Sequence, residues 1–139
     1  MSGTAATTTT DVNSSSSTDN DDEGGPVRAI YNAGIATVDG CSFVGTGEDG
    51  TDGGAIYNSV TSTELMVTDS SFSDFIVTGC GGAIYAEGAA SVTLKRNTFL
   101  RNTASASGGC VYAESGVAVE IEGGSFRLSS ASEGAAVAF

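Results

Sequence analysis

Hydrophobic positions recur along this chain at a nearly constant spacing. Residues 81–85 read GGAIY, and the pattern returns as GGAIY at 53–57 and GGCVY at 108–112. The aliphatic position of this segment falls at Ile30, Ile56, Ile84, Val111 and Val137, in steps of 26, 28, 27 and 26 residues by subtraction. A second marker keeps the same spacing, at Phe43, Phe72, Phe99 and Phe126. Two markers on one period identify a repeat protein.

Within each repeat, apolar and polar residues alternate over short segments. Residues 91–95 read SVTLK, which is the period of a β-strand with one buried face. Each repeat contains about three such strands between Gly-rich turns, and no segment has a sustained helical period. Strands this short cannot bury a face alone, so we expect each repeat to be one coil stacked on the next.

Stacking of the repeats places equivalent residues in rows that run up the stack. The rows would be Ile30, Ile56, Ile84 and Val111; Ala36, Leu65, Val92 and Val119; Val38, Val67, Leu94 and Ile121; and the four phenylalanines. All four rows are apolar, while the residues between them are mostly polar. The predicted fold is therefore an all-β, single-stranded parallel β-helix (a solenoid) of about four coils over residues 26–139.

The first 25 residues differ in composition from the repeats. They contain runs of Thr and Ser and five acidic residues without a basic one. Such a segment buries too little apolar area to offset its ordering entropy, so we expect a disordered Ser/Thr/Asp-rich tail over residues 1–25.

Composition excludes several functions. The chain has 139 residues, 5 basic and 17 acidic side chains, a net charge of −12 and no His. Nucleic acids and anionic membranes need a positive surface, so neither is an expected partner. No apolar run reaches the ~20 residues of a membrane-spanning helix, and no signal peptide is visible. The three cysteines, Cys41, Cys80 and Cys110, are odd in number and lack a CxxC spacing, so we expect buried or half-buried thiols.

One tyrosine follows the aliphatic residue in each repeat, at Tyr31, Tyr57, Tyr85 and Tyr112. Alternation along a strand should point these rings outward, in a strip spaced at about 4.8 Å. The strip could be a binding face for a glycan or a surface protein, or a ladder that stabilises the coils. We favour the ladder. Asn32 and Asn58 come next in sequence and predict a two-rung amide stack inside a turn.

An acidic Gly-rich loop is a candidate metal site. Glu48, Asp49 and Asp52 could supply oxygen ligands to calcium. The loop lacks the EF-hand order and occurs once, so a solvated loop without a cofactor is the favoured reading.

The repeat resembles a known family. GGAIY followed by F-x-x-N, here Phe99 and Asn102, is similar to the repeat of polymorphic outer membrane proteins, which have a pectin-lyase-like right-handed β-helix. The resemblance covers residues 26–139, although F-x-x-N occurs only in the third repeat. It implies a right-handed coil in an extracellular or cell-surface protein with a role in adhesion.

Three functions follow from these observations. The first is a non-catalytic structural or adhesive module, in a fragment of a longer repeat protein. The second is part of a carbohydrate-active β-helix enzyme (a polysaccharide lyase or hydrolase). The resemblance implies this alternative, because enzymes with the pectin-lyase-like β-helix act on acidic polysaccharides. No coil contains a dense Asp cluster flanked by Arg or Lys, so we do not expect an enzyme. The third is end-to-end self-association through the apolar segment 135–139, which begins a new coil.

Leu94→Asp tests the inward row. The substitution places an unpaired charge inside the stack, and we expect it to lower the free energy of unfolding by roughly 3–5 kcal/mol. Thermal melting followed by circular dichroism measures the effect, and a curve identical to that of the unsubstituted chain would place Leu94 on the surface.

Overall fold

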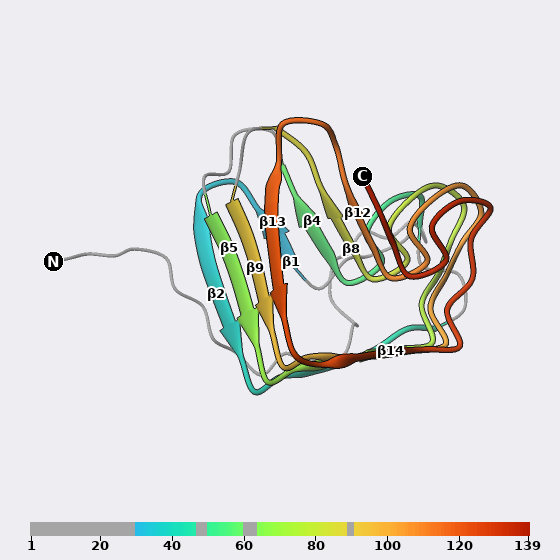
Figure 1. The fold of residues 1–139 in the computed structure, drawn as a ribbon, viewed down its shortest axis with the longest axis horizontal. Helices are drawn as coiled ribbons and strands as arrows, with labels where there is room; N and C mark the ends of the chain where they lie inside the picture. The colour runs from blue at the N-terminus through green and yellow to red at the C-terminus, as the bar shows by residue number, and fades with distance from the viewer. Residues whose placement is uncertain (1–29, 47–49, 60–63, 89–90) are drawn as a thin grey trace, which may run out of the picture.

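A computed structural model describes residues 30–46, 50–59, 64–88 and 91–139 of the chain. The predicted tail at 1–25 lies outside the described residues. The described part is all-β, with 15 strands and no helix. Its strands form a parallel β-solenoid of about four turns, as the repeat predicted (Figure 1).

The strands form three long sheets and one short sheet. The first sheet contains β1 (Ile30–Asn32), β4 (Ile56–Asn58), β8 (Ile84–Ala86), β12 (Val111–Ala113) and β15 (Val137–Ala138). The second contains β2 (Ile35–Asp39), β5 (Glu64–Thr68), β9 (Ser91–Lys95) and β13 (Ala118–Glu122). The third contains β3 (Ser42–Val44), β6 (Ser71–Ser73), β10 (Thr98–Leu100) and β14 (Ser125–Arg127). The short one pairs β7 (Ile76–Val77) with β11 (Thr103–Ala104).

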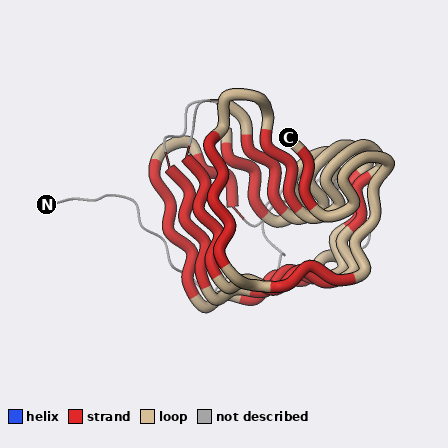
Figure 2. The backbone as a smooth tube through the Cα atoms, viewed as in Figure 1, coloured by secondary structure: helices blue, strands red, loops and turns tan. Residues whose placement is uncertain are grey.

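Each coil contains one strand of the first sheet and begins either at that strand, in coil 1, or at the glycine pair just before it. Coil 1 is residues 30–52, coil 2 is 53–80, coil 3 is 81–107 and coil 4 is 108–133, and β15 begins a fifth rung. In Figure 2 the tubes of successive coils follow almost the same path, one behind another. All strand pairs between coils are parallel.

The register of these pairs confirms the predicted rows. Leu94 pairs with Val67 on one side and with Ile121 on the other. Phe99 pairs likewise with Phe72 and Phe126, and these rings stack at centroid distances of 4.9 and 4.8 Å. Each apolar side chain therefore packs against its equivalents in the neighbouring coils and is buried by them.

The paired glycines of the GGAIY motif have different reasons to be glycine. Gly81 has a φ of +66°, in the left-handed region that favours glycine. Gly82 lies against the backbone of the next coil, where a Cβ would collide with the carbonyl oxygen of Gly109. The first glycine thus makes the turn, and the second allows two coils to approach closely.

The asparagine of F-x-x-N also bonds two coils together. Asn102 is fully buried, and its Oδ1 accepts a hydrogen bond from the Phe75 amide at 3.0 Å. Its Nδ2 donates to the Phe72 carbonyl at 3.0 Å. One side chain in coil 3 therefore satisfies two backbone groups of coil 2, where the chain leaves the phenylalanine row.

Asn97 does the same at the preceding corner. Its Oδ1 accepts the Ser70 amide and its Nδ2 donates to the Val67 carbonyl, both at 2.9 Å. The predicted amide stack is also present, because Asn32 Nδ2 donates to Asn58 Oδ1 at 2.7 Å. That stack ends at Asn58, whose buried Nδ2 has no hydrogen-bond partner among the described residues.

The short sheet was not predicted from the sequence. β7 and β11 have only two residues each, so they show no alternation that a pattern could reveal. Phe75 just before β7 is buried, as are Val77 and Ala104 within the two strands. These strands give coils 2 and 3 a fourth wall, where the sequence indicated about three strands per coil.

Asn102→Ala should destabilise the stack more than its small loss of volume suggests. It leaves the Phe75 amide and the Phe72 carbonyl without their buried partner, at about 1–3 kcal/mol for each group. Urea unfolding should show a midpoint well below that of Thr98→Ala, a control on the exposed face of the adjacent strand. Equal midpoints for the two variants would contradict the capping role of Asn102.

Candidate functional site: the tyrosine ladder

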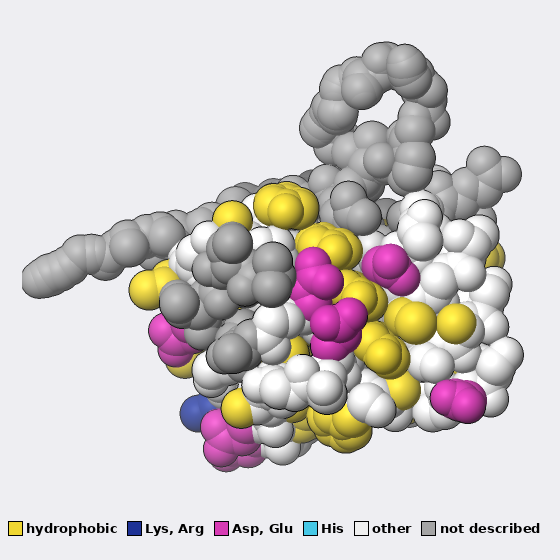
Figure 3. Space-filling view, turned by 90° about the horizontal axis from the view of Figure 1, so that it is seen from above, with side chains coloured by type: hydrophobic (Ala, Val, Ile, Leu, Met, Phe, Trp, Pro, Cys, Tyr) yellow, Lys and Arg dark blue, Asp and Glu magenta, His cyan; other side chains and the backbone are white. Residues whose placement is uncertain are grey.

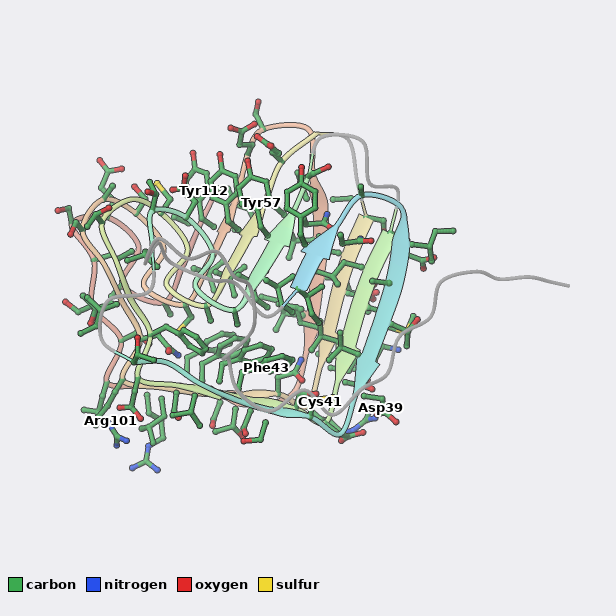
Figure 4. The ribbon with its side chains drawn as sticks, turned by 180° about the vertical axis from the view of Figure 1, so that it is seen from behind. Asp39, Cys41, Phe43, Tyr57, Arg101 and Tyr112 are labelled. Atoms are coloured by element: carbon green, nitrogen blue, oxygen red, sulfur yellow. The ribbon has the colours of Figure 1, made fainter. Side chains whose placement is uncertain are left out.

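The four tyrosines predicted as an outward strip lie in one row on the outer face of the first sheet. In Figure 4, Tyr57 and Tyr112 lie on the outer side of the strands of the first sheet, whereas Phe43 lies inside the coil. Their exposure is uneven. The Tyr31 side chain is 62% exposed, whereas Tyr85 is only 9% exposed because it lies between Tyr57 and Tyr112.

The ring faces of this ladder cover one another. Centroids of successive rings are 5.5, 5.1 and 5.5 Å apart, with interplanar angles of 3°, 19° and 14°. A sugar or an aromatic ligand stacks on a ring face, and the inner tyrosines present only ring edges and hydroxyls. This geometry favours the predicted stabilising ladder. A ligand could stack face-on only at the two ends of the row, and Tyr31 is the more exposed of these.

Two tyrosine hydroxyls are bonded to glutamates of the following coil. The Tyr57 hydroxyl donates to Glu87 Oε2 at 2.6 Å, and the Tyr85 hydroxyl donates to Glu114 Oε2 at 2.8 Å. Neither glutamate was predicted as a partner of the tyrosines from the sequence. A signal was present, because Tyr-Ala-Glu occurs at 85–87 and again at 112–114. Each glutamate therefore lies two residues beyond a tyrosine, and parallel stacking brings it to the hydroxyl of the coil before.

Burial and nearby negative charge both raise the pKa of Tyr85 and Tyr112. Burial, followed by the hydrogen bond to Glu114, raises the pKa of Tyr85 far above its usual value of 10.0. Burial also raises the pKa of Tyr112, with smaller contributions from Cys80, Glu114, Asp52 and Glu133. Both phenols therefore stay protonated at neutral pH, where Tyr85 can donate to a carboxylate but cannot act as a base.

The predicted calcium ligands are only partly described by the structure. Glu48 and Asp49 lie outside the described residues. Asp52 is half-buried, and its Oδ1 accepts the Cys80 amide at 2.8 Å. Within the described ranges, no three acidic or cysteine side chains gather into a possible metal site. Asp52 bonds coil 1 to coil 2, and calcium binding by this loop stays a prediction.

The three cysteines, all within the described ranges, form no disulfide with one another, and Cys41 and Cys110 are buried. Cys110 Sγ lies 2.7 Å from Ser129 Oγ and 3.9 Å from Asn102 Nδ2. Burial raises the pKa of the Cys110 thiol despite these two hydrogen bonds. A protonated thiol inside the coil is a poor nucleophile, so Cys110 serves the packing.

Ion pairs between coils hold most of the basic side chains. Arg96 makes two hydrogen bonds to Asp69, at 2.8 and 2.9 Å, and Arg101 makes two to Asp74, at 2.6 and 3.1 Å. These bonds lower the pKa of both aspartates. Lys95 lies 3.5 Å from Glu122. Three of the four basic residues that the structure describes are therefore paired with acids, which leaves little positive charge there to bind an anionic substrate.

Figure 3 views the side of the molecule that carries the tyrosine row. Hydrophobic side chains run across the visible part of this face, with acidic side chains beside them and basic atoms at the margin. A face of this kind repels polyanions and offers hydroxyls and carboxylates for hydrogen bonding.

No helix in the described part of the chain could cross a membrane.

Comparison with protein-family models, curated proteins and solved structures gives no match to this chain. The relation to polymorphic outer membrane proteins therefore stays a prediction from the repeat motif. The parallel β-solenoid itself stands on the strand pairing described above.

Alkaline pH should destabilise the chain through Tyr85. Because folding raises its pKa, the contribution of this phenol to stability is present below about pH 10 and falls as the pH rises above that value. Tyr85→Phe removes the titration and keeps the ring. Its urea midpoint should drop less than that of the unsubstituted chain between about pH 8 and about pH 10.5.

Tyr31→Phe is the matched control, because it removes one phenol from the exposed end of the same row. A drop in Tyr85→Phe as large as that in the unsubstituted chain would show that Tyr85 is not held protonated by folding.

Proposed function

We propose that this chain is a non-catalytic β-solenoid module of a cell-surface or secreted protein, with a structural or adhesive role. One observation carries the proposal: the polar side chains that could form a site are bonded from coil to coil. Tyrosine hydroxyls bond to glutamates, arginines to aspartates, and buried asparagines to the backbone. These bonds stabilise the stacking of the coils. A stabilised solenoid keeps the residues on its outer faces at fixed spacing, as a structural or adhesive module requires.

The distribution of charge gives less support to a polysaccharide-degrading enzyme. Two carboxylates of a hydrolase must flank one bond, about 5–10 Å apart, on a surface that holds the substrate. An acidic polysaccharide also needs basic side chains beside that bond. Here Arg96 and Arg101 are each occupied by an aspartate of the coil before, and the chain has no His to act as base.

An adhesive role has one favoured position, at Tyr31. Of the described rings only Tyr57 stacks on it, and it is the most exposed ring of the row. A sugar ring can stack on the other side, and the hydrogen-bonding edges of the neighbouring tyrosines extend the contact. We infer that a glycan or a surface protein would bind here, at the coil 1 end of the ladder.

Binding and catalysis can be tested on one preparation. The immobilised chain should bind a subset of a glycan array, or of a panel of extracellular proteins. Tyr31→Ala should weaken that binding at least roughly fivefold, since a stacked ring contributes about 1 kcal/mol or more. Thr98→Ala, on a different face, should bind as the unsubstituted chain does.

Incubation with polygalacturonate or alginate should release no new reducing or unsaturated ends. Release of many ends per protein chain, reduced by Glu120→Gln or Glu122→Gln, would replace the structural proposal with the enzymatic one. Binding unchanged in Tyr31→Ala would move the adhesive face away from the ladder.

A further inference from the structure

Two glutamates beside the tyrosine row form a row of like charges. The backbone amide of Glu87 donates to the Asn58 carbonyl at 3.0 Å. The amide of Glu114 repeats this bond one coil later, to the Ala86 carbonyl at 2.9 Å, so the two glutamates hold equivalent positions in successive coils. Equivalent residues of stacked coils lie about 5 Å apart, and like charges at that distance repel. The fold therefore holds two negative charges side by side.

These two glutamates differ from the acids that are paired within the stack. Asp69, Asp74 and Glu122 each pair with a basic side chain of coil 3. Within the described ranges, no ion pair joins Glu87 or Glu114 to a basic side chain. Each accepts a tyrosine hydroxyl at one carboxylate oxygen instead. A carboxylate has about four acceptor positions, so both glutamates keep the capacity to bind further donors.

The described basic residues lie on other faces of the solenoid. They are on or beside the second and third sheets, at Lys95, Arg96, Arg101 and Arg127. The described turns on either side of the first sheet carry acids instead, at Asp52, Glu87, Glu114 and Glu133. After burial, the further contributions to the raised pKa of Tyr85 and of Tyr112 come from acids and from Cys80, and none comes from a basic residue. Charge complementarity therefore selects a cationic partner for this face.

We propose that the outer face of the first sheet, over Tyr57, Tyr85 and Tyr112, is a docking site for a basic segment of another protein. The segment lies extended along the stack, and Lys or Arg side chains at alternate positions bind Glu87 and Glu114. Alternate side chains of an extended segment are about 7 Å apart, and long flexible stems let them reach carboxylates about 5 Å apart. The same aliphatic stems cover the edges of the tyrosine rings.

Two other occupants fit this face less well. Calcium takes about six to eight oxygen ligands, and no three acidic or cysteine side chains gather within the described ranges. A second copy of the chain carries the same net charge of −12, and three of its four described basic side chains are paired with its own acids. The inference depends on the solenoid and its charges and is separate from the adhesion proposed at Tyr31, so either can fail alone.

The probe is a fluorescent peptide of about eight residues in which Lys and Ser alternate, long enough when extended to cross coils 2 to 4. The full chain should bind it saturably in fluorescence anisotropy, with an affinity that falls as salt rises. A peptide of the same length in which Glu and Ser alternate should not bind. Glu87→Gln with Glu114→Gln should weaken binding at least roughly threefold, which is the scale of two exposed ion pairs. Gln still accepts the tyrosine hydroxyl, so this loss reports the charge.

Glu120→Gln with Glu122→Gln is the matched control, because it removes the same charge from the second sheet and should leave the affinity nearly unchanged. Circular dichroism checks that both variants keep the fold. Equal weakening in the two variants would overturn the proposal, since the peptide would then respond to net charge alone. Absence of binding at low salt would overturn it as well. Displacement of the peptide by about 1 mM calcium at constant ionic strength would assign the two glutamates to a metal ion instead.

Discussion

Parallel pairing of each coil with its equivalent in the next coil is the interaction on which this structure depends. It brings residues about 27 positions apart into rows, so that each side chain has its own counterpart as a neighbour. An apolar row gains burial from this arrangement, and an aromatic row gains stacking. A row of like charges would lose stability, and coil 3 instead supplies cations to the acids of its neighbours, as in Arg96 with Asp69 and Lys95 with Glu122. The same constraint explains the buried asparagines, since Asn97 and Asn102 bond to the coil before their own and Asn32 bonds to the coil after it.

The function proposed here follows from how much of the polar chemistry this pairing occupies. Tyr85 illustrates the point. Its ring lies between two other rings and its hydroxyl bonds to Glu114, so neither the face nor the hydroxyl hydrogen is available to a ligand. The most exposed tyrosine ring of the row is that of Tyr31, at the coil 1 end.

Much of the fold could be predicted because apolar marker residues recur in the sequence at a nearly constant spacing. The rows of Leu94 and Phe99 follow from counting residues between markers, and the register of the strands agrees with that count. The two-residue strands β7 and β11 could not be predicted, since a segment that short has no period. Glu87 and Glu114 were missed for a different reason. Their bonds join residues 29 or 30 positions apart, and that separation is visible only once the coils are in register.

The sequence by itself determined the period, the apolar rows, the outward position of the tyrosines and the surplus of negative charge. These properties are local or additive, so they can be read from residue types and their spacing. Only the tertiary structure decided which ring faces are covered, which arginine meets which aspartate, and that the row of Ala36 and Val119 is buried at one end and half-exposed at the other. The exposure of a side chain and the partner that it bonds to depend on which coils lie above and below its own. Those coils are formed by segments distant in the sequence, so the residue type alone does not determine them.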